Sequence, residues 1–195
     1  MPSPAPLILA STSRYRRELL QRLGLPFTVE APGVDEAASA GETPLARAER
    51  LALAKATAVA ARHPDATVIG SDQVALCGSV VLDKPGNAAT CRLQLQQLSG
   101  QQARFHTAVA IVQHSRDWRD CFIDLTTVQF RTLDEATITR YVAAEQPFDC
   151  AGGFRAEGLG ISLFTGIDSR DPTGLVGLPL IRVATALRAA GYAIP

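Results

Sequence analysis

The stretch Thr67-Val-Ile-Gly-Ser-Asp72-Gln73-Val-Ala-Leu76 organises this chain of 195 residues. Its apolar, β-branched run Val68-Ile69 predicts a buried strand that ends at Gly70-Ser71 and delivers Asp72 beyond the strand. Open α/β sheets bind ligands in that region, outside the carboxyl ends of their strands. We therefore expect Asp72 to belong to a ligand site.

Cations stand at two other predicted element boundaries. Ser11-Thr12-Ser13 predicts the cap of a helix whose first turn holds Arg14, Arg16 and Arg17, and Lys84-Pro85 follows a predicted hairpin. Cations at a helix N-terminus oppose the helix dipole by about 0.3–1 kcal/mol each. Three arginines in one turn favour a site that binds an anion. The alternative is that they are solvated side chains on the surface of an amphipathic helix. Together with Asp72, these cations indicate a polyanionic, metal-bound substrate.

Composition limits the function classes. Hydrophobic residues make up 47% and charged residues 19%, which is typical of a folded globular domain. The formal net charge is zero, which argues against bulk electrostatic binding of DNA, RNA or an anionic membrane. Any phosphate group must therefore be bound by a small number of specifically positioned cationic side chains.

Cysteine spacing and the N-terminal sequence bear on the compartment. The four cysteines form no CxxC pair or zinc spacing, so we expect free thiols in a reducing environment. Residues 1–5 are expected to be a disordered, proline-rich tail. The apolar run Leu7 to Ala10 is too short for a signal peptide or a membrane span. A soluble, cytoplasmic protein is expected.

Hydrophobic periodicity predicts alternating strands and helices. The expected strands are 7–10, 27–30, 67 onward, 103–113, 118–130 and 161–164, and a hairpin turning at Gly78-Ser79 brings Lys84 back towards Asp72. The expected helices are 14–23, 44–62, 88–98, 133–144 and one ending near 190, with a polar loop over 166–174. This alternation predicts one α/β domain over residues 1–195, with a mixed sheet flanked by helices.

Several residues have a structural alternative to a functional role. Lys55 lies near the apolar stripe of the second helix, so it either snorkels at the edge or points into a cleft. His63 is expected to act as a cation at the end of that helix, and His106 and His114 lack partners at metal-ligand spacing. The glycine-rich stretch 151–160 matches neither a Rossmann fingerprint nor a P-loop.

The residue types fit the hydrolysis of a nucleoside triphosphate. The reaction needs a divalent cation on oxygen ligands, cations to neutralise charge on the phosphoryl groups, and a carboxylate to orient or deprotonate water. Asp72, Glu36 and Glu157 supply carboxylates at element boundaries, and Lys55 and Lys84 supply cations.

The motifs fall in the order of a known family. Residues 9–20, Leu-Ala-Ser-Thr-Ser-Arg-Tyr-Arg-Arg-Glu-Leu-Leu, resemble the opening motif LASxSPRRxxLL of Maf-like nucleotide pyrophosphatases. Further motifs follow across nearly the whole chain: Gly70-Ser-Asp-Gln73, Lys84-Pro85, Leu98-Ser-Gly100, Ala151-Gly152-Gly153, Glu157-Gly158 and Val176-Gly-Leu-Pro-Leu180. The resemblance implies an inosine-triphosphatase-like α/β fold with two lobes around a central cleft, and a homodimer that needs Mg²⁺ or Mn²⁺.

The resemblance also implies a role for each matched position. Asp72 would accept the proton and bind metal, with Glu36 as the second metal carboxylate and Lys84 as a further catalytic group. Ser11, Arg16, Arg17, Lys55 and Lys84 would bind the phosphates. Specificity would reside in Tyr15, Gln73 and Glu157.

The specificity positions distinguish two branches of the family. The pyrimidine-directed branch carries Arg, Thr and Gln there, whereas an aromatic residue with Gln and Glu resembles the 7-methyl-GTP pyrophosphatases. A cationic N7-methylguanine stacks on an aromatic face, and Glu157 would accept its N1–H and amino protons. Two departures from this branch are Arg14 in place of the usual Pro and Tyr15 in place of Trp.

Hydrolysis of 7-methyl-GTP to 7-methyl-GMP and diphosphate is therefore the first hypothesis. One alternative is a pyrophosphatase for dTTP and UTP, or for a broad range of non-canonical nucleotides. The other is a non-catalytic, nucleotide-binding regulator of septum formation.

Overall fold

The computed structural model describes residues 5–195, so the predicted tail lies mostly outside the described residues, at 1–4. The chain divides into two compact units. Of the described residues, the first unit takes 5–73, 107–124 and 171–195, and the second takes 74–106 and 125–170. The prediction of a single domain over 1–195 stays a prediction.

A mixed sheet of seven strands supplies the scaffold, in the order β2-β1-β3-β5-β6-β7, with β4 paired to β3. The long strands β3 (Thr67–Cys77), β5 (Gln102–Gln113) and β6 (Trp118–Phe130) each contribute residues to both units. The 3₁₀ turn η1 (His114–Arg116) joins β5 to β6. The predicted α/β class, with a mixed sheet and helices, is confirmed.

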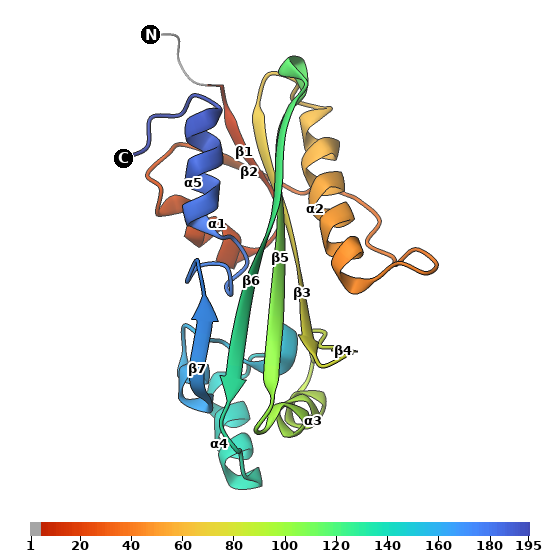
Figure 1. The fold of residues 1–195 in the computed structure, drawn as a ribbon, viewed down its shortest axis with the longest axis vertical. Coiled ribbons are helices and arrows are strands. Elements are labelled where there is room, and N and C mark those ends of the chain that lie inside the picture. Colours follow the sequence, from red (N-terminus) through yellow and green to blue (C-terminus); the bar gives the residue numbers. More distant parts are fainter. Residues whose placement is uncertain (1–4) are drawn as a thin grey trace. The chain divides into compact units, whose positions relative to one another are not determined.

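In the first unit, β1 (Leu7–Ala10) pairs in parallel with both β2 (Thr28–Glu30) and β3. Figure 1 shows α1 (Arg14–Gln21) and α5 (Leu180–Ala189) on one side of these strands and α2 (Pro44–Ala60) on the other. The buried core between the strands and α1 and α5 includes Leu9, Leu19, Ile69, Leu178 and Leu187. β1 and the first five residues of β3 are buried on both faces because helices cover both faces, whereas the edge strand β2 is largely exposed.

The contact between β3 and α2 depends on a glycine. A Cβ on Gly70 would meet the carbonyl oxygen of Ala52 and the amide nitrogen and Cβ of Ala56, all in α2. Any side chain at this position would therefore push α2 away from the strand. This packing holds Lys55, which is also in α2, against the same strand as Asp72.

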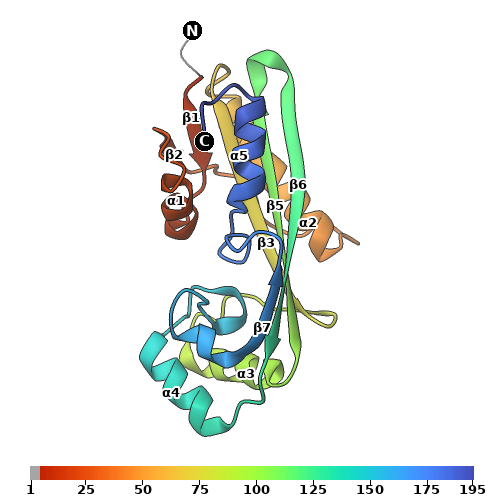
Figure 2. The same ribbon diagram turned by 60° about the vertical axis from the view of Figure 1, so that its left-hand side comes forward.

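The second unit holds β4 (Val80–Val81), α3 (Ala88–Leu98), α4 (Glu135–Glu145), the 3₁₀ segments η2 (Ala151–Gly153) and η3 (Leu159–Leu163), and β7 (Phe164–Ser169). Figure 2 shows α3 and α4 in this unit, where the two helices contact each other. Edge-to-face ring contacts join Phe154 to Phe105, Phe130 and Phe164, with centroids 5.1–5.4 Å apart. This aromatic cluster forms part of the core of the unit, together with buried aliphatic residues such as Leu95, Leu98 and Ile138.

Two predicted elements in this unit are wrong. Residues 159–163 form the 3₁₀ segment η3, where a strand was expected over 161–164. The strand begins at Phe164 and runs to Ser169, where a loop was expected, and it pairs antiparallel with β6. Its residues are largely exposed apart from Phe164 and Ser169, so they lack the apolar signal by which a buried strand is predicted.

None of the helices within residues 5–195 has the length and apolar character needed to cross a membrane.

Candidate active site

The parallel register of β1 and β3 brings the first two sequence motifs together. Ala10, the last residue of β1, is aligned with Gly70 of β3. Ser11 and Ser71 follow these partners directly, and both are buried. The hydroxyl of Ser11 accepts from the backbone amide of Ser13. The hydroxyl of Ser13 in turn caps α1, because it accepts from the backbone amide of Arg16. The start of α1 is thereby fixed beside β3.

Asp72 occupies a different position from the one predicted. It does not follow the end of a strand, because β3 continues to Cys77 and pairs there with β4. The parallel pairing with β1 ends at Gly70, however, so β3 extends past its neighbour. Asp72 is therefore part of a strand and lies just beyond the end of β1.

Lys55 joins two of the predicted carboxylates. Its Nζ lies 2.7 Å from Oδ1 of Asp72 and 2.7 Å from Oε1 of Glu36. The Lys55 side chain is 7% exposed, that of Asp72 19% and that of Glu36 58%. Of the two alternatives for Lys55, a position at the helix edge and one pointing towards charged groups, the structure shows the second.

Arg16 lies close enough to the same carboxylates to feel their charge. Burial lowers the pKa of its guanidinium, and the charges of Asp72 and Glu36 act in the opposite direction. Its Nε donates to the carbonyl of Gly177 at 3.0 Å, as does the hydroxyl of Ser71 at 2.9 Å. Arg17, the next residue, is exposed.

Two arginines of α2 hold the segment that carries Glu36. Arg47 donates to the carbonyl of Glu36 at 2.7 Å. Arg50 donates to the carbonyl of Ala37 at 2.9 Å and to both carboxylate oxygens of Glu42 at 2.6 and 2.8 Å. The arginine bonds and the amide of Ser39 lower the pKa of Glu42 to about 2. Neither arginine has a spacing signal that would have revealed this role from sequence.

Two of the three residues predicted to determine specificity, Tyr15 and Gln73, have partners of their own. The guanidinium carbon of Arg14 lies 4.7 Å from the centre of the Tyr15 ring. A guanidinium nitrogen of Arg14 donates to the phenol oxygen of Tyr15 at 2.6 Å. Gln73 donates its amide to Thr107 and to the carbonyls of Gly174 and Leu175. Sequence reasoning missed Thr107, because a buried threonine in a long strand has no distinguishing pattern.

Lys84 and Glu157 belong to the second unit, and both are exposed. The backbone before Lys84 is fixed, because the carbonyl of Asp83 accepts from Gln94 at 2.9 Å and from the amide of Gly152 at 3.3 Å. After Glu157, the amide of Leu159 donates to the carboxylate of Glu145 at 2.6 Å. Their approach to Asp72 stays a prediction.

His63, expected to act as a cation at the end of α2, pairs with a carboxylate of β2. Its Nε2 lies 2.6 Å from Glu30, whose other oxygen accepts from Arg62, and the two partners lower the pKa of Glu30. The pair ties the end of α2 to β2 and has no contact with Asp72.

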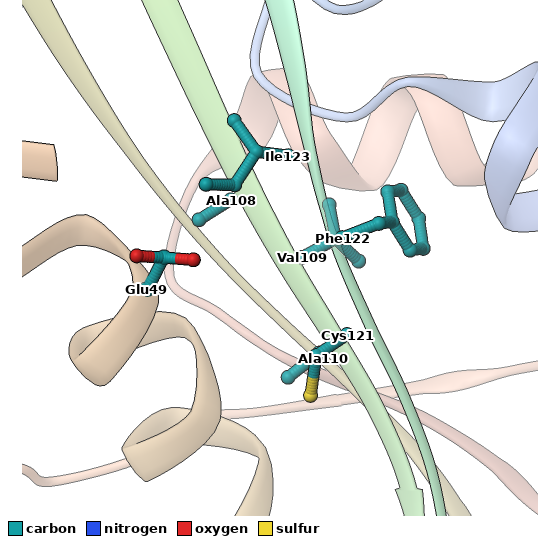
Figure 3. A pocket seen from close by; sticks show the side chains of 7 residues that line it. All are labelled: Glu49, Ala108, Val109, Ala110, Cys121, Phe122 and Ile123. Carbon is teal, nitrogen blue, oxygen red and sulfur yellow. The ribbon is translucent and has the colours of Figure 1, made fainter. Parts of the chain in front are cut away.

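A pocket of about 200 Å³ also lies in the first unit. Figure 3 shows the carboxylate of Glu49, from α2, facing residues of β5 and β6. None of the predicted site residues lines this pocket, whose lining consists of Glu49, Ala108, Val109, Ala110, Cys121, Phe122 and Ile123. The pocket is therefore separate from the cluster formed by Asp72, Lys55 and Glu36.

Two carboxylates that meet at one cationic nitrogen are suitable for a divalent cation. Oxygen atoms of Asp72 and Glu36 both lie within 2.7 Å of the Lys55 Nζ, so they converge on one small region. Mg²⁺ is bound in proteins by one or two carboxylates and completes its shell with water and substrate phosphates. The donor set therefore fits the metal that the sequence implies.

Known proteins resemble this chain over nearly its whole length. A 7-methyl-GTP pyrophosphatase of Xanthomonas axonopodis pv. citri is 57% identical over 189 residues, which cover 97% of this chain and 98% of the relative. A protein of the same name from Polaromonas sp. is 53% identical over 193 residues, which cover 99% of this chain and 88% of the relative.

Solved structures confirm the expected fold. A HAM1 protein from Coxiella burnetii aligns with a TM-score of 0.52 at 15% identity, covering 95% of this chain and 99% of its own. The Staphylococcus aureus Ham1 protein has the same TM-score at 12% identity, covering 94% and 99%. At such identities the likeness concerns the fold alone. The family model described as Maf-like protein matches residues 6–190, and the chain therefore belongs to the Maf-like protein family.

Proposed function

We propose that this protein is a nucleoside triphosphate pyrophosphatase that hydrolyses 7-methyl-GTP to 7-methyl-GMP and diphosphate. Relatives that bear the name 7-methyl-GTP pyrophosphatase and share more than half of their residues with this chain support the substrate. The single structural observation that carries the chemistry is the contact of Lys55 with both Asp72 and Glu36.

In this proposal Asp72 is the general base. A water oxygen attacks the α-phosphorus, Asp72 takes a proton from that water, and the bond from the α-phosphorus to the bridging oxygen breaks. Diphosphate then leaves with the bonding electrons. A carboxylate suits this role because its oxygens accept hydrogen bonds and can take up a proton.

Asp72 and Glu36 would hold the divalent cation, Mg²⁺ or Mn²⁺. Bound there, such a cation supplies positive charge to the phosphoryl oxygens as a Lewis acid. Lys55 contributes positive charge in the same place, and Arg16 adds the guanidinium that lies near both carboxylates. Charge that develops on the leaving group is thus met by fixed cations.

Ser11, Arg17 and Lys84 complete the proposed phosphate-binding set. Lys55 and Lys84 are the two lysines of the chain, and arginines and three histidines provide its other basic side chains. A compact ammonium group on a flexible stem is suited to a point contact with phosphate. Both lysines stand at positions that the family resemblance assigns to phosphates, which supports a shared role.

Tyr15, Gln73 and Glu157 are proposed to recognise the base. The aromatic ring of Tyr15 would stack on the cationic methylated base. Gln73 and Glu157 would accept its N–H protons. We also propose that the enzyme is cytoplasmic and acts as a homodimer.

Release of pyrophosphate from 7-methyl-GTP, GTP, dTTP, UTP and CTP, with Mg²⁺ or Mn²⁺, tests the proposal. We expect 7-methyl-GTP to have the highest kcat/KM. Asp72→Asn should abolish turnover, and Asp65→Asn, which changes an exposed aspartate before β3, is the matched control. A flat or pyrimidine-led profile would replace the substrate with the dTTP/UTP alternative. Tight binding without product would favour the non-catalytic regulator.

A further inference from the structure

The side-chain amide of Gln73 has one orientation in this structure. Its Nε2 lies 2.7 Å from the hydroxyl of Thr107, 3.1 Å from the carbonyl of Gly174 and 3.2 Å from the carbonyl of Leu175. Carbonyl oxygens accept and never donate, so only the nitrogen of the amide can face them. The flipped amide would place its oxygen against two carbonyl oxygens. The hydrogen-bond network therefore assigns the flip state.

Thr107 also fixes the orientation of the Gln73 amide. Its side chain is fully buried in β5, and its hydroxyl donates to the carbonyl of Gly174 at 2.9 Å. A hydroxyl has one proton, so with that proton committed to Gly174 it offers only lone pairs to Gln73. Thr107 can therefore accept from the Gln73 amide but has no proton left to donate to it.

The loop that supplies the two carbonyls is itself held in place. Buried Asp171 accepts from the amide of Thr173 at 2.9 Å, from the hydroxyl of Thr173 at 2.6 Å and from the amide of Ile181 at 2.6 Å. The hydroxyl of Thr173 accepts in turn from the amide of Leu180 at 2.8 Å. The loop is thereby tied to the start of α5 on both sides of Gly174.

We infer that Thr107 is a positioning residue that makes Gln73 present its Oε1, a fixed hydrogen-bond acceptor, to the base of the substrate. The inference rests on the proposed function and deepens it. Within residues 5–195, the hydrogen bonds of the Gln73 side chain all run from Nε2, which is fully used, and Oε1 is left to accept from a ligand. A fixed acceptor favours bases with N–H donors on their pairing edge, such as 7-methylguanine with its N1–H and amino group. Cytosine has only one donor group on that edge, its amino group, beside a ring nitrogen that is itself an acceptor, so a fixed acceptor favours it less than 7-methylguanine with its two adjacent donors.

The test is the ratio of kcat/KM for 7-methyl-GTP to that for CTP. Thr107→Val keeps the shape of the side chain and removes the hydroxyl, and Thr107→Ser keeps the hydroxyl as the matched control. The Val variant should lower the ratio by about three- to tenfold, which corresponds to one hydrogen bond. The Ser variant should stay near the wild-type ratio. A merely structural role for Thr107 would lower both rates together and leave the ratio unchanged, and that result would overturn the inference.

A second measurement needs neither turnover nor a folded Val variant. In the ¹⁵N-labelled wild-type protein, both side-chain NH₂ protons of Gln73 should exchange slowly with solvent and resonate away from free-amide positions, identified by their loss in Gln73→Leu. Rapid solvent exchange of these protons at free-amide positions would contradict the fixed orientation. If the wild type releases no pyrophosphate from any nucleotide while the signals are protected, the proposed function fails and the orientation of Gln73 stands.

Discussion

The Nζ of Lys55 and the Oδ1 of Asp72 lie 2.7 Å apart, and the same Nζ is 2.7 Å from Glu36. A lysine from α2 therefore offsets part of the negative charge of the two carboxylates that are proposed to hold the metal. Like charges at such close range are costly unless a cation lies between them. Lysine and metal would thus share the task of balancing this charge.

Lys55→Met should lower kcat by about 100-fold or more, because the charge on the phosphoryl oxygens loses a fixed cation. The variant should also gain more thermal stability from Mn²⁺ than the wild type does, since the metal would relieve repulsion between Asp72 and Glu36. Melting temperatures with and without Mn²⁺, in the absence of nucleotide, give this readout. Lys84→Met is the control, and an equal shift in all three proteins would contradict the prediction.

Arg14→Ala should lower KM for 7-methyl-GTP by about two- to fivefold, which is the range of an exposed cation–π contact. Arg14 covers the Tyr15 ring, so it competes with a cationic base for the same face. GTP, whose base is neutral, should show little change. Steady-state kinetics with both nucleotides check this, with Arg22→Ala as the control. A rise in KM for both would instead assign Arg14 to phosphate binding.

The pair of Glu42 and Arg50 predicts a pH-dependent contribution to stability. The pKa of Glu42 falls from its ordinary 4.5 to about 2, so the folded state favours the carboxylate. The contribution is therefore fully present above pH 4.5 and is lost as the pH falls towards 2. The difference in Tm between wild type and Glu42→Gln should be constant above pH 5 and shrink below it. Glu18→Gln, on the exposed face of α1, serves as control, and a difference that grows in acid would refute the assignment.

Asp171→Ala should lower the free energy of unfolding by about 2 kcal/mol, the upper range for loss of a helix cap. It should also raise KM, because the loop whose Gly177 carbonyl holds Arg16 would lose its anchor. Urea denaturation and kinetics with 7-methyl-GTP measure the two effects. Asp171→Asn retains one acceptor oxygen and should lose less of both. Loss of stability with an unchanged KM would limit Asp171 to a capping role.

Local sequence signals predicted most helices and strands of both units. Ser13 caps α1 within the expected Ser11-Thr12-Ser13 segment, Thr43 and Asn87 cap the expected helices α2 and α3, and the strand over 118–130 has the expected bounds. These features depend on neighbours within a few residues, which periodicity and capping preferences describe. The exposed strand β7 was missed because its pairing with β6, and not its own composition, makes it a strand.

The sequence by itself determined the α/β class, the capped helices and the residue types of a phosphate-handling site, because each rests on short-range patterning. Only the tertiary structure decided which charges meet. Lys55 reaches Asp72 because Gly70 allows α2 to pack tightly on β3. Gln73 faces the loop at Gly174 because a buried hydroxyl and two carbonyls leave its amide one orientation. Such contacts join residues that are up to 102 positions apart in the chain, and no local pattern encodes their distance.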